Sequence, residues 1–411
     1  MAQAHPGAGP LAGVRVIDLS TVVFGPYASQ FLADWGADVV KIESPEGDMT
    51  RQIGACVEPG LAALFVGVNR NKRSVVIDLK TADGRELLGR LVEDADVVLH
   101  NIRPHKLTSI GLEPGALRAR NPRLVFAGLH GFGEEGPYAG RPAYDDVVQG
   151  LSGLAALMEA QCGEPRYVPT TLADKSAALV AAQAVLAALF ARERTGCGCM
   201  IEVPMFETVV SFGLVEHMEG QAFDPPTGPM GYRRALSTLR RPMKTLDGRL
   251  CIMPYTDAHW HRFFEAAGDA TFLADPKFAS VAERSRHIEA LYQRMAERLA
   301  ERTTRYWLEL CDRHDIPAAQ VNSLEDVQRD PHLAATGHFA RVDDPSCPVT
   351  LLANPVRFDG QRAPLRMPPR HGEHTEQVLR EAGLSDVELA QLLAAGVVRG
   401  WPTSARRGNG K

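Results

Sequence analysis

Short segments rich in apolar and β-branched residues recur through the first half of the chain, separated by longer stretches in which apolar positions have a helical spacing. The short segments predict strands at 14–18, 38–43, 74–79, 96–100, 124–128 and 200–204. The stretches between them predict helices at 27–35, 81–93 and 114–121. The segment at 96–100 lacks polar alternation, which is typical of a strand buried on both faces. Because strands alternate with helices, the pattern favours a doubly wound, Rossmann-like α/β sheet.

The longest helical pattern, 171–196, is rich in Ala and Leu, has no internal Pro or Gly, and ends at Gly196. Asp174 stands near its start, where a carboxylate faces the free amides of the first turn and the positive end of the helix dipole. Two interpretations are open at this point. Asp174 is a helix cap, for which aspartate is a preferred residue, or it is a nucleophilic carboxylate held ionised at the edge of a pocket.

Ligands of a doubly wound sheet bind beside the carboxyl ends of its strands. The loops that follow the predicted strands are therefore candidate ligand loops, and they lie at 21–26, 44–51, 101–106 and 130–144. Four more helices are predicted, at 144–158, 206–219, 375–382 and 385–395. The last of these opens with a capping box formed by Ser385 and Glu388.

The local composition changes after residue 220, where prolines, glycines and arginines indicate a linker or mobile loop. Its four arginines are Arg233, Arg234, Arg240 and Arg241. A strand predicted at 249–253 and amphipathic helices predicted at 260–268, 281–302 and 304–314 then indicate a smaller α+β domain. The expected organisation is the N-terminal part of a large α/β domain at 1–220, a linker and small domain at 221–330, and a segment returning to the large domain at 331–411. The ends, 1–10 and 406–411, are expected to be a disordered tail and a frayed terminus.

Composition is that of an ordinary soluble protein, with 45% hydrophobic residues, 23% charged residues and a net charge of −5. That balance gives no electrostatic reason to expect nucleic acid or an anionic membrane as a partner. No secretory signal is seen, and no apolar segment is expected to reach the ~18 residues of a membrane span. The seven cysteines are scattered and odd in number, which favours a cytoplasmic protein without structural disulfides.

Three motifs are weaker than they first look. The glycines of Gly131-Phe-Gly-Glu-Glu-Gly136 have dinucleotide-binding spacing, but no helix opens after them, so a mobile glycine loop is expected instead. Cys197 and Cys199 have no second ligand pair nearby, and His259 and His261 have no carboxylates at metal spacing, so no metal site is predicted. The phosphate loop of ATP-driven enzymes is also missing from the sequence.

A set of short motifs spreads over nearly the whole chain in one order. They are Leu11-Ala-Gly-Val-Arg-Val-Ile-Asp18, Gly36-Ala-Asp-Val-Val-Lys-Ile-Glu43, Gly47-Asp48, Asn71-Lys-Arg-Ser-Val-Val-Ile-Asp-Leu-Lys80, Asn101-Ile-Arg-Pro104, Gly136-Pro-Tyr138, Tyr144-Asp145, the Asp174 helix and Gly372-Glu-His-Thr375. The ordered set strongly resembles the class III coenzyme A transferases. That family includes formyl-CoA transferase, carnitine CoA-transferase and the 2-methylacyl-CoA racemases.

The resemblance implies an interlocked homodimer in which each chain forms a ring threaded by the other. It implies that Asp174 is the nucleophile and that Asp145 is an acidic neighbour that assists it. It also implies that CoA or acyl-CoA binds as a substrate, with no tightly bound cofactor. Family positions that contact CoA correspond here to Val23, Phe24, Asp78, Leu79, Lys80, Asn101, Ile102, Arg103 and Tyr144.

Two departures from the family pattern concern the CoA phosphates. Two arginines that contact the nucleotide in formyl-CoA transferase are replaced here by Ser44 and Ser109. Arg51, Arg103 and Lys106 are the candidates to supply the missing positive charge.

A third departure concerns the reaction. Racemases of the family have a histidine before the aspartate at the Tyr144-Asp145 position, where it acts with the helix aspartate as a proton-transfer pair. This chain has Tyr144, and an unperturbed tyrosine titrates near ~10, too high for an efficient base at neutral pH. The sequence therefore favours CoA transfer over racemisation.

The expected activity is transfer of CoA from an acyl-CoA to a carboxylic acid through an anhydride and a thioester on Asp174, under a lid formed by the glycine loop. The four arginines at 233–241 are candidates to bind a second carboxylate of a dicarboxylate such as succinate, itaconate or mesaconate, with a solvated basic loop as the alternative. A non-catalytic CoA-binding protein is a further alternative, against which the intact Asp174 and Asp145 argue.

Overall fold

The computed structural model describes residues 9–401, which fold as two compact units. Unit 1 contains the chain up to Ser152, Thr170–Phe212 and the chain from Pro331 onward, and unit 2 contains Gly153–Pro169 and Gly213–Asp330. Residues 153–169, which the sequence analysis places in the range 1–220, therefore group with unit 2. Residues 1–8 and 402–411 lie outside the described residues, and with them all of the predicted frayed end at 406–411 and all of the predicted tail at 1–10 except Gly9 and Pro10.

A seven-stranded sheet forms the centre of unit 1, in the order β12-β3-β2-β1-β4-β5-β6. Every neighbouring pair is parallel except β12 with β3, which is antiparallel. The strands are β1 Arg15–Asp18, β2 Asp38–Glu43, β3 Arg73–Ile77, β4 Val97–His100, β5 Val125–His130, β6 Met200–Pro204 and β12 Val398–Arg399. The prediction of a parallel α/β sheet is confirmed. Its strand order reverses between β1 and β4, which is where such sheets bind ligands.

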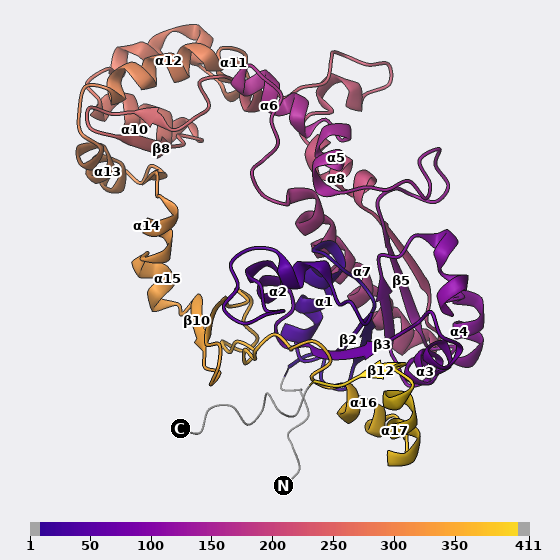
Figure 1. Cartoon of the computed structure of the whole chain (residues 1–411). Helices are drawn as coiled ribbons and strands as arrows, with labels where there is room; N and C mark the ends of the chain where they lie inside the picture. The colour runs from indigo at the N-terminus through magenta and orange to yellow at the C-terminus, as the bar shows by residue number, and fades with distance from the viewer. Residues whose placement is uncertain (1–8, 402–411) are drawn as a thin grey trace. The chain divides into compact units, whose positions relative to one another are not determined.

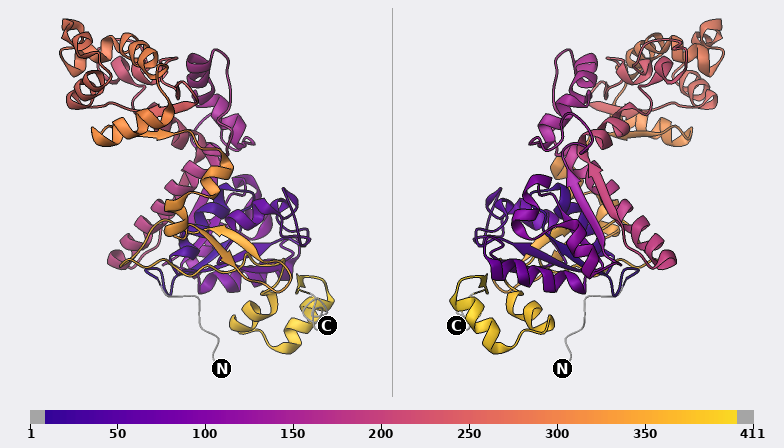
Figure 2. Two further views of the ribbon diagram at one scale, coloured as in Figure 1. Left: turned by 90° about the vertical axis from the view of Figure 1, so that its left-hand side faces the viewer. Right: turned by 90° about the vertical axis from the view of Figure 1, so that its right-hand side faces the viewer.

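Helices cover both faces of this sheet, as Figure 1 shows. Helices α1 and α7 pack against each other on one face, and leucines of α3, α4, α16 and α17 enter the core on the other. In Figure 2 the yellow C-terminal helices lie beside the indigo N-terminal sheet, because β12 pairs with β3. The helices of eight or more residues in unit 1 are α1 Phe24–Asp34, α3 Ala82–Glu93, α7 Leu172–Thr195, α8 Met205–Leu214 and α17 Asp386–Ala394. The shorter ones are α2 Ala63–Val68, α4 Pro114–Arg120, α5 Asp145–Leu151, α15 Pro331–Ala335 and α16 Thr375–Glu381, and a hairpin joins β10 Phe339–Val342 to β11 Val349–Leu352.

Helix α7 corrects one expectation about apolar segments. It is 24 residues long and apolar enough to cross a membrane by length and composition, although the sequence analysis expects no such segment. Half of its most apolar stretch is buried inside the protein, and it packs against α1, β5 and β6. That environment explains the apolar residues on its buried half, because a helix face that packs against a core is apolar.

Several helix boundaries differ from prediction, each for a local reason. Helix α1 begins at Phe24 and not at 27, because Pro26 is tolerated in a first turn. The single helix predicted at 144–158 is two helices, α5 and α6 (Leu154–Cys162), separated at Gly153 with a φ of +88°. The predicted helix 281–302 is likewise divided at His287 into α11, Val281–Arg286, and α12, Ile288–Leu299. The predicted helix 206–219 ends at Leu214, whereas the predicted capping box of Ser385 and Glu388 is confirmed.

Unit 2 has its own hydrophobic core, built around aromatic residues. Trp260, Phe263, Phe264 and Trp307 are buried among leucines of the surrounding helices. A three-stranded antiparallel sheet completes the unit, with strands β7 Met243–Lys244, β8 Arg249–Ile252 and β9 Ala318–Gln320. Its helices are α6 Leu154–Cys162, α9 Arg233–Leu236, α10 Asp257–Ala266, α11 Val281–Arg286, α12 Ile288–Leu299, α13 Thr304–Arg313 and α14 Leu324–Gln328.

Candidate functional site

Asp174 lies in the first turn of α7, but its side chain is not a helix cap. The N-cap residue is Thr171, which makes no side-chain cap hydrogen bond. The backbone N–H of Asp174 instead donates to Oδ2 of Asp145, at 3.0 Å. Among the described residues, no group donates a hydrogen bond to the Asp174 carboxylate, which is 8% exposed. Its two oxygens are therefore free to react with a ligand.

The electrostatic setting of Asp174 differs from the expectation of a firmly ionised carboxylate. Burial, and then the nearby charge of Asp145, raise the pKa of Asp174 to about 7, while Lys175 lowers it. The dipole of α7 favours the ionised form, but burial in a low dielectric outweighs it. Near neutral pH, a fraction of the molecules thus holds Asp174 ionised and another fraction holds it protonated.

Asp145 is fixed from two sides at the start of α5. Its Oδ1 accepts a hydrogen bond from Nε2 of Gln149 at 2.5 Å, and its Oδ2 accepts from the backbone of Asp174. Nε2 of Gln149 also contacts the carbonyl oxygen of Thr170 at 3.3 Å. Gln149 follows Asp145 by one helical turn, and that spacing is the signal by which the sequence could have pointed to it. Gln149 thus aligns the second carboxylate with the start of α7.

The Asp145→Asn variant is expected to lower the pKa of Asp174, because it removes the like charge and leaves the burial unchanged. The acid limb of the pH profile of kcat/KM for CoA exchange should then move to lower pH, by about one unit. Asp146→Asn is the matched control, since Asp146 is the exposed neighbour on the same helix. If the acid limb stays in place in the Asp145 variant, the charge of Asp145 does not raise the pKa of Asp174.

A cavity of about 220 Å³ lies where the loops after β1, β4 and β5 meet. It occupies the switch point of the sheet, as expected for a ligand site. Its polar and aromatic lining residues are Thr21, Asn101, Arg103, His130, Phe132, Glu134, Arg141 and Tyr144. Tyr144 directly precedes Asp145, so one short segment carries both a cavity wall and the acidic neighbour of Asp174.

Only part of the predicted CoA-contacting set lines this cavity. Asn101, Arg103 and Tyr144 line it. Val23 and Phe24, expected in a ligand loop, lie instead at the start of α1 and are 2% and 3% exposed. The adjacent Thr21 and Val22 line the cavity, and so do His130 and Arg141, which the sequence analysis did not select. The remaining predicted residues, Asp78, Leu79, Lys80, Ile102 and Lys106, are not among the residues that line it.

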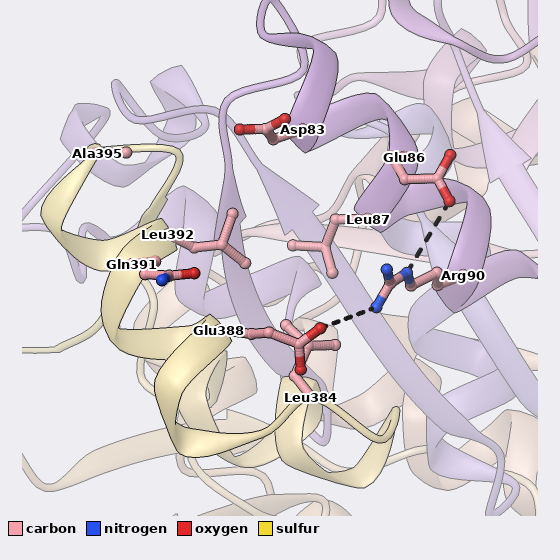
Figure 3. Close-up of a pocket in the computed structure, with 9 residues that line it drawn as sticks. All are labelled: Asp83, Glu86, Leu87, Arg90, Leu384, Glu388, Gln391, Leu392 and Ala395. Carbon is pink, nitrogen blue, oxygen red and sulfur yellow. Dashed lines mark ion pairs between the residues drawn. The ribbon is translucent and has the colours of Figure 1, made fainter.

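The predicted Asp78–Lys80 loop leads into α3, beside a different cavity of about 290 Å³ between α3 and α17 (Figure 3). Arg90 forms ion pairs there with Glu86 and Glu388, and Asp83 is a third acidic residue at the edge. This cavity has more negative than positive side chains. It is therefore a poor candidate for the phosphates of CoA.

The three basic residues proposed for those phosphates differ in availability. Arg51 is buried, bound through two nitrogens to Glu43 at 2.6 and 2.7 Å, and stacked over Phe65. It is not free to hold a phosphate without breaking that pair. Arg103 and Lys106 are exposed. Arg103 lines the switch-point cavity together with Arg141, so these two arginines are the better candidates.

The glycine loop at 131–136 is anchored, in contrast to the mobile loop expected from the sequence. The backbone N–H of Gly133 donates to Glu207 at 3.0 Å, and that of Glu134 donates to Glu202 at 2.7 Å. A β-carbon on Gly131 would come within 2.4 Å of Ala143. Glycine is thus needed there for close packing, and the loop forms a wall of the cavity. As expected, no helix opens directly after it.

The four arginines of the predicted basic loop all lie in unit 2. Arg234 is half-buried, donates to the hydroxyl of Tyr292 at 3.1 Å and lies over the ring of Tyr255. Arg240 and Arg241 line a cavity of about 560 Å³ whose other walls are mostly apolar. Within residues 9–401, no ion pair is seen for Arg233, Arg234, Arg240 or Arg241.

The chain matches CoA-transferase family III over residues 11–375. It is 34% identical to the "Probable fatty acyl-CoA transferase Rv3272" of Mycobacterium tuberculosis, over 89% of this chain and 96% of the relative. The crystal structure of an aspartate-to-alanine variant of Rv3272 superposes with a TM-score of 0.80 at 32% identity, covering 91% of this chain and 99% of that one.

Two further relatives are named for the acids they use. Succinate–glutarate CoA-transferase of Agrobacterium fabrum is 33% identical over 90% of this chain and 95% of the relative. Succinyl-CoA:mesaconate CoA-transferase of Haloarcula hispanica is 32% identical over 92% of this chain and 97% of the relative.

Proposed function

Because this chain belongs to CoA-transferase family III, we propose that it moves coenzyme A from an acyl-CoA to a dicarboxylic acid through covalent intermediates on Asp174. The observation that carries the mechanism is the position of the Asp174 carboxylate. It lies at the start of α7 without a hydrogen-bond donor among the described residues, and its pKa of about 7 allows ionisation at neutral pH. A nucleophile needs that ionised, uncommitted form.

The reaction exchanges one thioester for another, so no ATP is consumed. A carboxylate oxygen of Asp174 attacks the thioester carbon of the donor, the C–S bond breaks, and CoA thiolate leaves behind a mixed anhydride. The thiolate then attacks the carbonyl carbon of Asp174 and expels the donor acid as a carboxylate. The acceptor carboxylate attacks the resulting aspartyl thioester, and the released thiolate finally attacks the acceptor's carbonyl. The carboxylate of Asp174 is regenerated without net transfer of protons or electrons.

The environment of Asp174 suits these intermediates, because water hydrolyses anhydrides. A buried carboxylate keeps its acyl adducts away from bulk water. The switch-point cavity supplies Arg103 and Arg141 for anionic parts of CoA. Asp145, held by Gln149 and by the backbone of Asp174, keeps the start of α7 in a fixed position.

A dicarboxylate acceptor is supported by the two relatives named for succinate, glutarate and mesaconate. Arg233, Arg234, Arg240 and Arg241 are the candidates to bind its second carboxylate, since arginine binds carboxylates through two parallel hydrogen bonds. Their lack of ion pairs among the described residues leaves them available for this role.

The interlocked homodimer and the cytoplasmic setting stay part of the proposal. Exposed apolar side chains on helix α7 support the homodimer. Leu179, Val180 and Phe190 are 44%, 40% and 62% exposed in the single chain. Apolar side chains of this size on a core helix favour contact with another chain.

The test is an acceptor scan with succinyl-CoA as donor and no ATP. We expect glutarate, itaconate or mesaconate to be converted to its CoA thioester about tenfold or more faster than a monocarboxylate of equal length, because the monocarboxylate leaves the arginines unpaired. Preference for monocarboxylates would reject the dicarboxylate assignment. A separate incubation of a 2-methylacyl-CoA in D₂O, without acceptor, tests the racemase alternative. Entry of deuterium at the carbon next to the thioester would favour that alternative.

A further inference from the structure

Val22 has an unusual backbone conformation for its residue type. Its φ is +72°, in the left-handed region, and its side chain is branched at Cβ. Such a conformation is strained for a β-branched residue and persists only where the surroundings hold it. Val22 is also one of the residues that line the switch-point cavity.

A buried ion pair holds the strained residue. The backbone N–H of Val22 faces both carboxylate oxygens of Asp48, at 3.3 and 3.4 Å. Asp48 is paired at 3.0 Å with Lys41, and both side chains are fully buried. The Lys41 ammonium also donates to the carbonyl oxygen of Ser20 at 2.7 Å. One ion pair thus fixes the chain at Ser20 and at Val22.

Two more polar groups fix the rest of the loop. Lys72, also fully buried, donates to the carbonyl oxygen of Pro26 at 2.8 Å and pairs with Asp18 at 3.1 Å. Asn101 exchanges two hydrogen bonds with the backbone of Thr21, at 3.1 and 2.8 Å. The residues Asp18, Lys41, Asp48, Lys72 and Asn101, which we call the loop clamp, therefore hold the segment 20–26 at both ends and in the middle.

The cost of this arrangement points to a role beyond packing. Removing two lysines and two aspartates from water is expensive, and apolar residues of similar volume often serve stability as well or better. Every member of the loop clamp contacts the segment 20–26 or a partner that does. The benefit is thus a single loop conformation at the cavity wall, and preorganisation of that kind increases affinity for a ligand.

We propose that Val22 is a positioning residue, held left-handed by the Lys41–Asp48 pair so that the wall formed by Thr21 and Val22 is preformed for the coenzyme A part of the substrate. The inference rests on the proposed function, because it assigns the switch-point cavity to CoA. It adds which residues prepare that cavity before the ligand arrives.

The first test is Val22→Gly, measured by calorimetric titration with free coenzyme A and by thermal unfolding. Glycine adopts positive φ without strain, so the folded protein should keep or raise its unfolding midpoint. The loop loses its fixed wall, so the dissociation constant for CoA should rise by about threefold or more. CoA binding then weakens without any loss of stability, which a residue with only a structural role would not produce. An unchanged dissociation constant would overturn the proposal.

The second test replaces the ion pair by apolar residues, in the double variant Lys41→Met/Asp48→Leu. Its dissociation constant for CoA should rise by about tenfold, because the loop loses two of its anchors. The matched control is Asp34→Leu/Arg70→Met, which removes another buried ion pair of unit 1 that does not touch the segment 20–26. Equal losses in both double variants would overturn the proposal.

These outcomes are distinct from failure of the proposed function. Wild-type protein that binds CoA but transfers none would reject the Asp174 chemistry and leave the loop clamp testable. Wild-type protein that does not bind CoA would reject both.

Discussion

Replacing Asp174 by asparagine is expected to reduce CoA transfer by about ten-thousand-fold or more, because an amide cannot form the anhydride on which every later step depends. The backbone N–H of residue 174 keeps its bond to Asp145, so the start of α7 should stay intact. The measurement is kcat for formation of the acceptor's CoA thioester, with circular dichroism to confirm folding. Asp174→Ala serves as a second variant that cannot revert by deamidation.

The role of Asp174 can also be tested by looking for the covalent CoA adduct on the wild-type protein. Wild-type protein incubated with succinyl-CoA and digested at low pH should yield a peptide containing Asp174 that carries the added mass of CoA, and the variants should not. Asp146→Asn is the control, since this exposed carboxylate lies on α5 next to Asp145 but is not assigned to the site. A folded Asp174→Ala protein that retains transfer, or an adduct on another residue, would reject Asp174 as the nucleophile.

The parallel sheet could be predicted from the sequence because its strands depend on local pattern. The segments of β1 to β5 are mostly buried, as suits strands covered by helices on both faces, whereas the edge strand β6 exposes Met200 and Glu202. The resemblance to class III coenzyme A transferases could also be seen in the sequence, because the family's motifs are short and follow one order along the chain. The match to CoA-transferase family III over residues 11–375 confirms it. Helix ends were less predictable, because Gly153 and His287 interrupt patterns that otherwise continue.

The sequence could propose a nucleophile but not its electrostatics. The start of the long helix left Asp174 open between a helix cap and a nucleophile, and the resemblance to class III coenzyme A transferases favoured the nucleophile. Its raised pKa depends on burial and on Asp145, which is 29 positions earlier in the chain, and local pattern does not report contacts at that separation. Arg51 shows the same limit, because only the fold reveals its pairing with Glu43. Val22 could not be selected either, since nothing in a single sequence marks a positive φ at valine.

Asp174→Asn is also expected to stabilise the protein in a pH-dependent way. The folded pKa of Asp174 is about 7, whereas that of an unfolded aspartate is near ~3.9. Below the unfolded value both states hold the proton, and the variant should match the wild type. As pH rises toward about 7, the unfolded state releases its proton first, so the wild type progressively loses stability. Above about 7 the variant should be more stable by ~2–4 kcal/mol.

Urea denaturation at about pH 4 and about pH 8.5 measures this difference, and Asp146→Asn, which alters an exposed carboxylate, should show no comparable pH-dependent gain. Equal stability of the Asp174 variant and the wild type at the higher pH would mean that the folded protein does not raise the pKa of Asp174. The sign of the effect connects stability to chemistry. The ionised carboxylate that attacks the thioester is the form that the fold accommodates least well, so the reactive state is maintained at a cost in stability.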